Sequence, residues 1–345
     1  MFIFHTQRIT LPDARLLALM SGITLFFNSA LIQAEHVHAR PDAHAPIGVM
    51  GDHVMNRSEI MIEYRYMSMT MDGNRAGTDR VPVPLPGYMV SPLSMDMQMH
   101  MLGIMYAPTD RLTLSVMTPV LSLSMDHRVN MNNTEFTAEA SGLGDISVGA
   151  VYQVHSTGNS SLLLNFAISG PTGSIDEKDV TPASAGQAVQ LPYPMQPGSG
   201  SHALIPGLTW TRQYDNWSLG VQGLYTHYLE TNDNGYRLGD RLNTSVWLAR
   251  KLDHSFSMSA RLNALDRGNI DGSDKNLPEP PVVPTQDPKL RAGTRVDALL
   301  GLNYVAHGLN ALRLAAEVGA PVYQNLDGPQ LETDLLFTLG AQYTF

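Results

Sequence analysis

The chain has 345 residues, of which 43% are hydrophobic and 16% charged, with no cysteine and a net charge of −10. The lack of cysteine excludes disulfide scaffolds, cysteine-ligated zinc and thiol catalysis, and the acidic balance argues against nucleic acid as a partner. A mean hydropathy of −0.10 excludes a helical membrane protein with several spans, because such a protein needs repeated apolar runs of about 20 residues.

The N-terminus has the pattern of an export signal. Arg8 and Arg15 precede an apolar run from Leu16 to Phe27, and small residues follow as far as Ala34. The apolar run is too short to cross a bilayer, and this order of features is typical of a cleaved secretory signal. We predict a signal peptide over residues 1–34.

The next segment, residues 35–58, is rich in His, Ala, Pro and Gly and shows no periodicity. Pro41 and Pro46 disfavour regular structure. We predict a periplasmic N-terminal arm, which either hangs free or folds into the rest of the protein as a plug.

From residue 59 onward, polar and apolar residues alternate with a period of two, which is the signal of β-strands that face two environments. In the first of these segments Ile60, Ile62 and Tyr64 lie opposite Glu63 and Arg65. The predicted strands are about ten residues long, as tilted transmembrane strands need to be. There are twelve of them: 59–71, 94–106, 111–120, 144–154, 161–170, 203–212, 217–229, 241–250, 255–264, 294–305, 311–320 and 334–345.

The links between these strands alternate between short and long, and the long ones are 72–93, 121–143, 171–202, 230–240, 265–293 and 321–333. Short periplasmic turns, long extracellular loops and an even number of antiparallel strands are typical of outer-membrane barrels. We predict an all-β fold, a transmembrane antiparallel up-and-down β-barrel over residues 59–345, in the cell outer membrane and in contact with outer-membrane lipid. The alternative is a large exported β-sandwich or lipocalin-like barrel.

The last strand ends in Phe345, with an apolar or aromatic residue at every second position before it. This ending resembles the C-terminal signature of bacterial outer-membrane proteins. We therefore expect the barrel-assembly machinery to be a partner through Phe345.

Three stretches carry a family resemblance: APIGVMGDHVMNRSEIMIEYRYMSMTMDGNRAGTDRV, which begins at Ala45, SGLGDISVGAVYQV (141–154) and GPTGS (170–174). They resemble the bacterial outer-membrane transporter family named for the meta-pathway of phenol degradation. The resemblance implies a β-barrel and a channel, with hydrophobic or aromatic compounds as cargo.

The inner face of the predicted barrel collects charged side chains of both signs. They form either a polar translocation path for a small-molecule solute or a set of ion pairs that fill the lumen, because unpaired charges there are costly. The candidate lumen residues are Glu63, Arg65, Asp96, His100, Arg241, Arg261, Arg295, Asp297, Arg313, Glu317 and Asp334.

Most of the 19 methionines lie between Met50 and Met131. Thioethers are soft ligands for Cu(I), and imidazole binds copper and zinc, so a copper ion is the one cofactor that we consider. The candidate ligands are His36, His38, His44, Met50, His53, Met55, Met67, Met69 and Met71. The simpler interpretation is that methionine serves as a flexible hydrophobe, with Met95, Met97, Met99 and Met101 directed at lipid, opposite Asp96 and His100.

An enzymatic barrel would need a nucleophile, a base and a carboxylate within reach. Ser124, Asp126 and His127 are close in sequence, but neighbours along a strand point to opposite faces, and no hydrolase motif is present. We predict a channel for small solutes and no enzyme. A copper-handling barrel is the first alternative, and a structural or adhesive barrel that acts through loops 171–202 and 265–293 is the second.

Overall fold

The computed structural model describes residues 40–345 apart from residue 183 and residues 307–311. The predicted signal peptide therefore lies outside the described residues. Within the described part, the regular structure consists of strands and two short 3₁₀ turns, η2 (Tyr193–Met195) and η3 (Pro284–Gln286). No helix in this part is long and apolar enough to cross a membrane.

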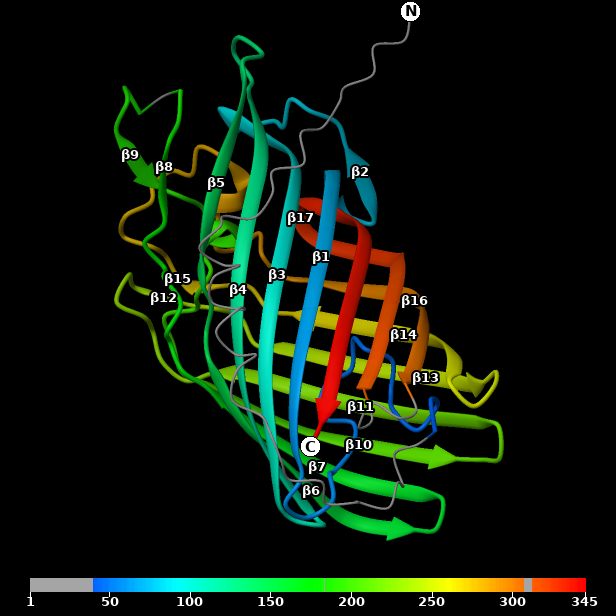
Figure 1. The fold of residues 1–345 in the computed structure, drawn as a ribbon. Helices are drawn as coiled ribbons and strands as arrows, with labels where there is room; N and C mark the ends of the chain where they lie inside the picture. Colours follow the sequence, from blue (N-terminus) through cyan, green and yellow to red (C-terminus); the bar gives the residue numbers. More distant parts are fainter. Residues whose placement is uncertain (1–39, 183, 307–311) are drawn as a thin grey trace, which may run out of the picture. The chain divides into compact units, whose positions relative to one another are not determined.

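Eleven strand elements form a closed antiparallel wall, because the last of them pairs with the first (Figure 1). Their order around the wall follows the chain. They are β1 (Ile60–Gly77), β3 (Val90–Thr109), β4 (Leu112–Val129), β6 (Ser147–Thr157), β7 (Ser160–Ser169), β10 (Ala203–Gln213), β11 (Trp217–Tyr228), β13 (Arg241–Lys251), β14 (Phe256–Arg267), β16 (Gly293–Ala306) and β17 (Leu312–Thr344).

The element β17 supplies two segments of the wall. Its residues 312–326 pair with β16 and its residues 326–344 pair with β1, antiparallel in both cases. A ring of eleven antiparallel strands cannot close without one reversal of direction, so these two parts of β17 run in opposite directions. The wall thus has twelve antiparallel segments, and the predicted all-β barrel is confirmed.

The remaining strands lie at one end of the barrel, beyond the wall segments or within the long loops. They are β2 (Asp79–Val81), β5 (Glu135–Leu143), β8 (Lys178–Val180), β9 (Ala188–Gln190), β12 (Tyr236–Arg237) and β15 (Asp271–Gly272). Here β2 pairs with β1, β5 with β4, β8 with β9, and β12 with β15. We call this the loop end, and the opposite end, with its tight connections, the turn end.

Three predicted loops are partly wrong, because strands continue through them. Residues 72–93, 121–143 and 321–333 contain the upper parts of β1, β3, β4 and β17, together with β2 and β5. The prediction limited strands to the length that a membrane requires, whereas β1, β3 and β4 have 18, 20 and 18 residues.

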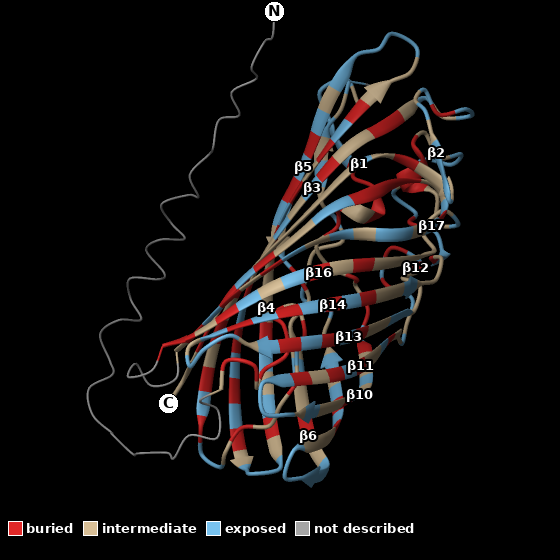
Figure 2. Ribbon diagram, turned by 90° about the vertical axis from the view of Figure 1, so that its right-hand side faces the viewer, coloured by how far each residue is buried: buried red, intermediate tan, exposed pale blue. Residues whose placement is uncertain are grey.

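Toward the turn end, the outside of the wall is an apolar belt. Buried and exposed residues alternate along the wall strands there (Figure 2). Large hydrophobic side chains are exposed on most of these strands. Examples are Leu102, Ile104, Val148, Phe166, Leu208, Val246, Leu262, Leu300, Leu302, Val318 and Leu339. An outward apolar band on a closed antiparallel barrel is what bilayer lipid covers, so the fold is that of an outer-membrane protein.

In the loop-end half of β3 the inner face is apolar and the outer face is polar, which is the reverse of the polarity expected for a strand in a membrane. Met95 and Met101 are buried and Asp96 is exposed, so the methionines face inward and Asp96 and His100 face outward. The prediction that placed Asp96 and His100 in the lumen and Met95, Met97, Met99 and Met101 against lipid is therefore wrong. Beyond the apolar belt the outside of the wall faces water, and the inside is filled by Leu191 and Met195 of the loops, which pack on the methionines.

Candidate functional site: the barrel lumen

Residues 40–58 of the arm lie inside the ring of strands. Their backbone oxygens accept hydrogen bonds from inward side chains on well-separated strands, at 2.6–2.8 Å: Arg65 to Ile47, Asn165 to Gly51, Gln222 to Met50, Ser257 to Pro41 and Arg313 to Ala45. The donors stand on β1, β7, β11, β14 and β17. A short segment can reach all five strands only from within the barrel.

Glycines allow the arm and the wall to approach each other closely. A Cβ atom at Gly48 would lie 2.9 Å from Cζ of Arg261, and one at Gly340 in the wall would lie 2.7 Å from Cδ1 of Ile47. Gly51 has a φ of +68°, a conformation that residues with a side chain rarely adopt. The sequence of the arm is therefore fitted to this inserted position.

Buried ion pairs surround the arm. Glu63 accepts a hydrogen bond from Arg65 at 3.0 Å, and Glu317 accepts two from Arg261 at 2.9 and 2.7 Å. Arg313 donates to Asn303 and Gln342 at 2.6 and 2.8 Å. At this level the lumen is filled by charged side chains that are paired with each other or hydrogen-bonded to neutral groups.

Neighbouring groups keep one acidic residue of the arm, Asp52, in its ionised form. Burial by itself raises the pKa of Asp52, but His53, His44 and Arg313 outweigh burial and hold the pKa well below its usual range. Asp52 also accepts the backbone N–H of Ala45 at 2.7 Å. The carboxylate therefore stays ionised inside the barrel and closes the arm into a loop.

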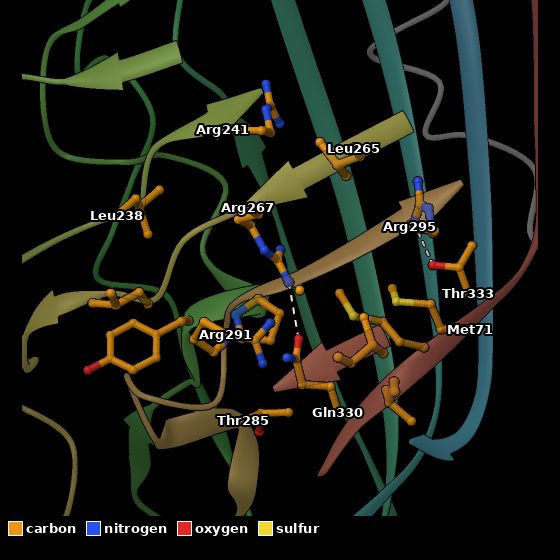
Figure 3. A pocket seen from close by; sticks show the side chains of 18 of the residues that line it. Met71, Leu238, Arg241, Leu265, Arg267, Thr285, Arg291, Arg295, Gln330 and Thr333 are labelled. Carbon is orange, nitrogen blue, oxygen red and sulfur yellow. Dashed lines mark hydrogen bonds between the residues drawn. The ribbon is translucent and has the colours of Figure 1, made fainter. Parts of the chain in front are cut away.

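Toward the loop end, the lumen opens into a cavity of about 340 Å³ (Figure 3). One wall is apolar and consists of Met69, Met71, Met95, Met97 and Met125. The facing wall carries four arginines, Arg241, Arg267, Arg291 and Arg295. Tyr193, Ile270 and Thr285 from the loops complete the lining, so the loops form part of the cavity wall.

The cavity is positively charged. Arg267 donates to Gln330 at 3.1 Å, and Arg295 lies 2.9 Å from Asp297, while no Asp or Glu is among the described residues that line the cavity. Burial, and then the charge of Arg267, lower the pKa of Arg291 to about 9. An anion in the cavity would offset the repulsion among these guanidinium groups.

The predicted lumen residues fall into three groups. Glu63, Arg65, Arg261, Arg313 and Glu317 surround the arm, while Arg241 and Arg295 line the cavity, with Asp297 beside Arg295. Asp96 and His100 lie outside, where the hydroxyl of Tyr64 is 2.7 Å from Nδ1 of His100. Asp334 is exposed at a β-bulge next to Leu335 and does not line the cavity.

The predicted metal ligands separate in a similar way. His44, His53 and Met55 line one small cavity in the arm, whereas Met50 is 39% exposed. Met67 packs against buried methionines, and Met69 and Met71 line the large cavity. His36 and His38 lie outside the described residues.

Sequence reasoning missed Arg267, Arg291 and Asp52. Arg267 shares the parity of Arg261 along β14, so the same alternation, continued three residues past the predicted end of that strand, would have found it. Asp52 is adjacent to His53 in the arm and is a plausible ligand by position. Arg291 lies in a loop without periodicity, and nothing in the sequence marks it.

The residues considered for hydrolysis do not converge. Asp126 accepts hydrogen bonds from Ser94 and Thr137 at 3.0 and 2.6 Å. His127 is buried and stacks on Phe136 with ring centroids 5.0 Å apart. Because the two side chains occupy opposite faces of β4, they cannot act as one catalytic unit.

The closed wall and its apolar belt define an outer-membrane β-barrel. Residues 78–267, more than half of the chain, match the family described as "Putative MetA-pathway of phenol degradation". The chain belongs to this family.

One solved structure shares this fold, and others are similar to a lower degree. A crystal structure of an outer membrane channel from Pseudomonas putida is similar with a TM-score of 0.59 and 14% identity, over 85% of this chain and 98% of that one. The KdgM porin is similar with a TM-score of 0.39 and 12% identity, over 83% of this chain and 99% of that one. A Pseudomonas aeruginosa FadL homologue is similar with a TM-score of 0.37 and 13% identity, over 83% of this chain and 89% of that one. None of the curated protein sequences matches this chain.

Proposed function

We propose that this barrel is an outer-membrane channel for small hydrophobic or aromatic solutes, and that it favours those that carry a negative charge. The observation that supports the proposal most strongly is the cavity at the loop end, where a methionine wall faces an arginine wall. The family description, which refers to phenol degradation, and the fold shared with an outer membrane channel point in the same direction.

The two walls suit the two parts of an amphipathic anion. Methionine side chains adapt to irregular apolar shapes and contact aromatic rings favourably. Arginine binds carboxylate groups through paired hydrogen bonds. The volume of about 340 Å³ is at the low end for ligand pockets, which run from about 300 to 1,000 Å³, so the cargo is small.

Passage through the barrel requires the arm to move. Residues 40–58 of the arm are held to the wall by hydrogen bonds, which can break and reform, and they contribute no strand to the wall. We therefore assign it the role of a plug. Cargo enters from the loop end, rests in the cavity and leaves toward the periplasm when the arm is displaced.

The test is calorimetric binding of benzoate and of its neutral analogue benzamide to the purified barrel in detergent. Hydrogen bonds to charged groups contribute about 1.5–3 kcal/mol each, so benzoate should bind at least about tenfold more tightly than benzamide. Arg267→Gln and Arg291→Gln should each reduce this preference. Arg250→Gln is the matched control, because Arg250 stacks on Trp217 far from the cavity. Equal affinity for the two compounds, or an unchanged preference in both cavity variants, would refute the proposed charge preference.

A further inference from the structure

Two histidines and an aspartate converge within the arm. Nδ1 of His53 lies 2.9 Å from one carboxylate oxygen of Asp52, and Nδ1 of His44 lies 3.8 Å from the other. A ligand atom from each residue lies within 4.8 Å of those from the other two. His44 and Asp52 are buried, and His53 is largely so.

The fold of the arm creates this convergence. His44 and His53 stand at the two ends of a loop that Asp52 closes by accepting the N–H of Ala45. The left-handed conformation of Gly51 turns the chain just before Asp52, and the two imidazole rings meet edge to face with centroids 4.5 Å apart. The contact between Asp52 and Ala45 also orients the carboxylate, as supporting hydrogen bonds commonly do at metal sites.

The space beside the histidines has the size of an ion. It is a cavity of about 20 Å³, lined by His44 and His53 together with Met55, Glu59 and Met61. Arg313 also lines it and keeps its positive charge, because its hydrogen-bond acceptors Ala45, Asn303 and Gln342 are neutral. The carboxylates of Asp52 and Glu59 set two negative charges against this one positive charge, so the surroundings of the cavity can accept a cation.

We propose that His44, Asp52 and His53 form a binding site for a divalent transition-metal ion of the zinc or copper class. Two imidazoles and one carboxylate are a common ligand set for these ions and leave a coordination position open. Ligand atoms about 2.1 Å from a tetrahedral ion lie about 3.4 Å from one another. The observed spacings therefore need shifts of about an ångström or less for most pairs.

A bound ion would strengthen the inserted state of the arm. It would link both ends of the loop whose middle, Ile47 and Val49, accepts hydrogen bonds from Arg65. Because the ion binds the folded loop and not the extended arm, a free concentration 100 times the dissociation constant shifts the equilibrium toward the inserted arm by about 100-fold.

The first experiment is calorimetric titration of the purified barrel, without a histidine tag, with Zn²⁺. We expect one ion per chain, and Co²⁺ in its place should give the visible absorption of a site with nitrogen and oxygen ligands. His44→Asn and His53→Asn should each weaken Zn²⁺ binding by more than about 100-fold, since loss of a ligand exceeds the 10–100-fold cost of losing a supporting residue. His227→Asn is the control, because His227, near the end of β11, lies 2.8 Å from a single carboxylate, that of Asp240, outside the proposed site.

A second measurement follows the arm itself. In a variant with Val49→Cys as the sole cysteine, free Zn²⁺ at 100 times its dissociation constant should slow maleimide labelling about 100-fold. The additional change His53→Asn should abolish this slowing. Heat-modifiable migration on gels verifies that each variant has folded. The absence of one-to-one Zn²⁺ binding to the folded barrel would overturn the proposal. Equal weakening by His227→Asn would also overturn it.

Discussion

Replacing Gly48 by alanine should release the arm without harming the wall. The added Cβ would overlap the guanidinium of Arg261 and the carboxylate of Glu317. These two groups are buried and joined by two hydrogen bonds of 2.9 and 2.7 Å. In the inserted state of the variant, the ends of the Arg261 and Glu317 side chains must therefore move, and this movement weakens the hydrogen bonds between them.

The size of the effect follows from the ion pair. A hydrogen bond to a charged group contributes about 1.5–3 kcal/mol. Loss of one of the two bonds in the inserted state disfavours insertion by about 2 kcal/mol, which corresponds to a roughly 30-fold shift toward the released arm. The wall regains the intact pair once the arm has left, so the stability of the barrel itself should change little.

The assay uses the natural lack of cysteine. Val49 is 3% exposed and packs against Ala45 and Trp247, so Val49→Cys reports on release of the arm through its rate of labelling by a polar maleimide. Adding Gly48→Ala should raise that rate roughly 30-fold. Gly158→Ala is the control, because its Cβ would meet nothing within 4 Å. A rate within about threefold of the parent would refute the inserted packing of Gly48 against Arg261.

Three further predictions concern the wall. Leu123 is 3% exposed and faces inward, so Leu123→Lys buries an unpaired charge and should lower the unfolding temperature strongly. Ser122→Lys, on the outward neighbour, should be tolerated. Equal tolerance of the two changes would contradict the reversed polarity at the loop end. Leu300→Arg in the apolar belt should destabilise the barrel by about 2–4 kcal/mol in urea titrations in lipid, whereas Gln98→Arg should leave the free energy of unfolding nearly unchanged. A larger loss with Gln98→Arg than with Leu300→Arg would contradict the assigned position of the belt. Deletion of Phe345, whose N–H donates to Ile60 at 2.8 Å, should reduce the amount of folded barrel in the outer membrane, and unchanged amounts would argue against its recognition during assembly.

The period-two alternation was sufficient to predict the architecture, because lipid outside and polar surroundings inside impose opposite demands on neighbouring residues. Leu300 and Leu302 are exposed, and Leu299 and Asn303 are buried, as that alternation requires. The same reasoning failed at Met95 and Asp96, where water replaces lipid outside the wall. Alternation alone gives the two faces of a strand and not which of them faces inward.

The site was predicted less completely than the fold. Arg65, Arg261 and Arg313 follow from strand parity, but which arm oxygens accept from Arg65 and Arg313 depends on where a segment without periodicity inserts. The convergence of His44 with Asp52 depends on the turn at Gly51, and Arg291 reaches the cavity from a loop. Such positions depend on contacts between distant parts of the chain, and a local pattern does not encode them.

We propose above that the arm closes a channel through this barrel. The most direct measurement is single-channel conductance in a planar bilayer, with the mature chain and with a variant that lacks residues 35–58. With the arm as a plug, the mature chain should show low conductance, the shortened chain should show a steady and clearly larger conductance, and benzoate added at the loop end should block that current. Equal conductance in the two forms, or none in either, would contradict it.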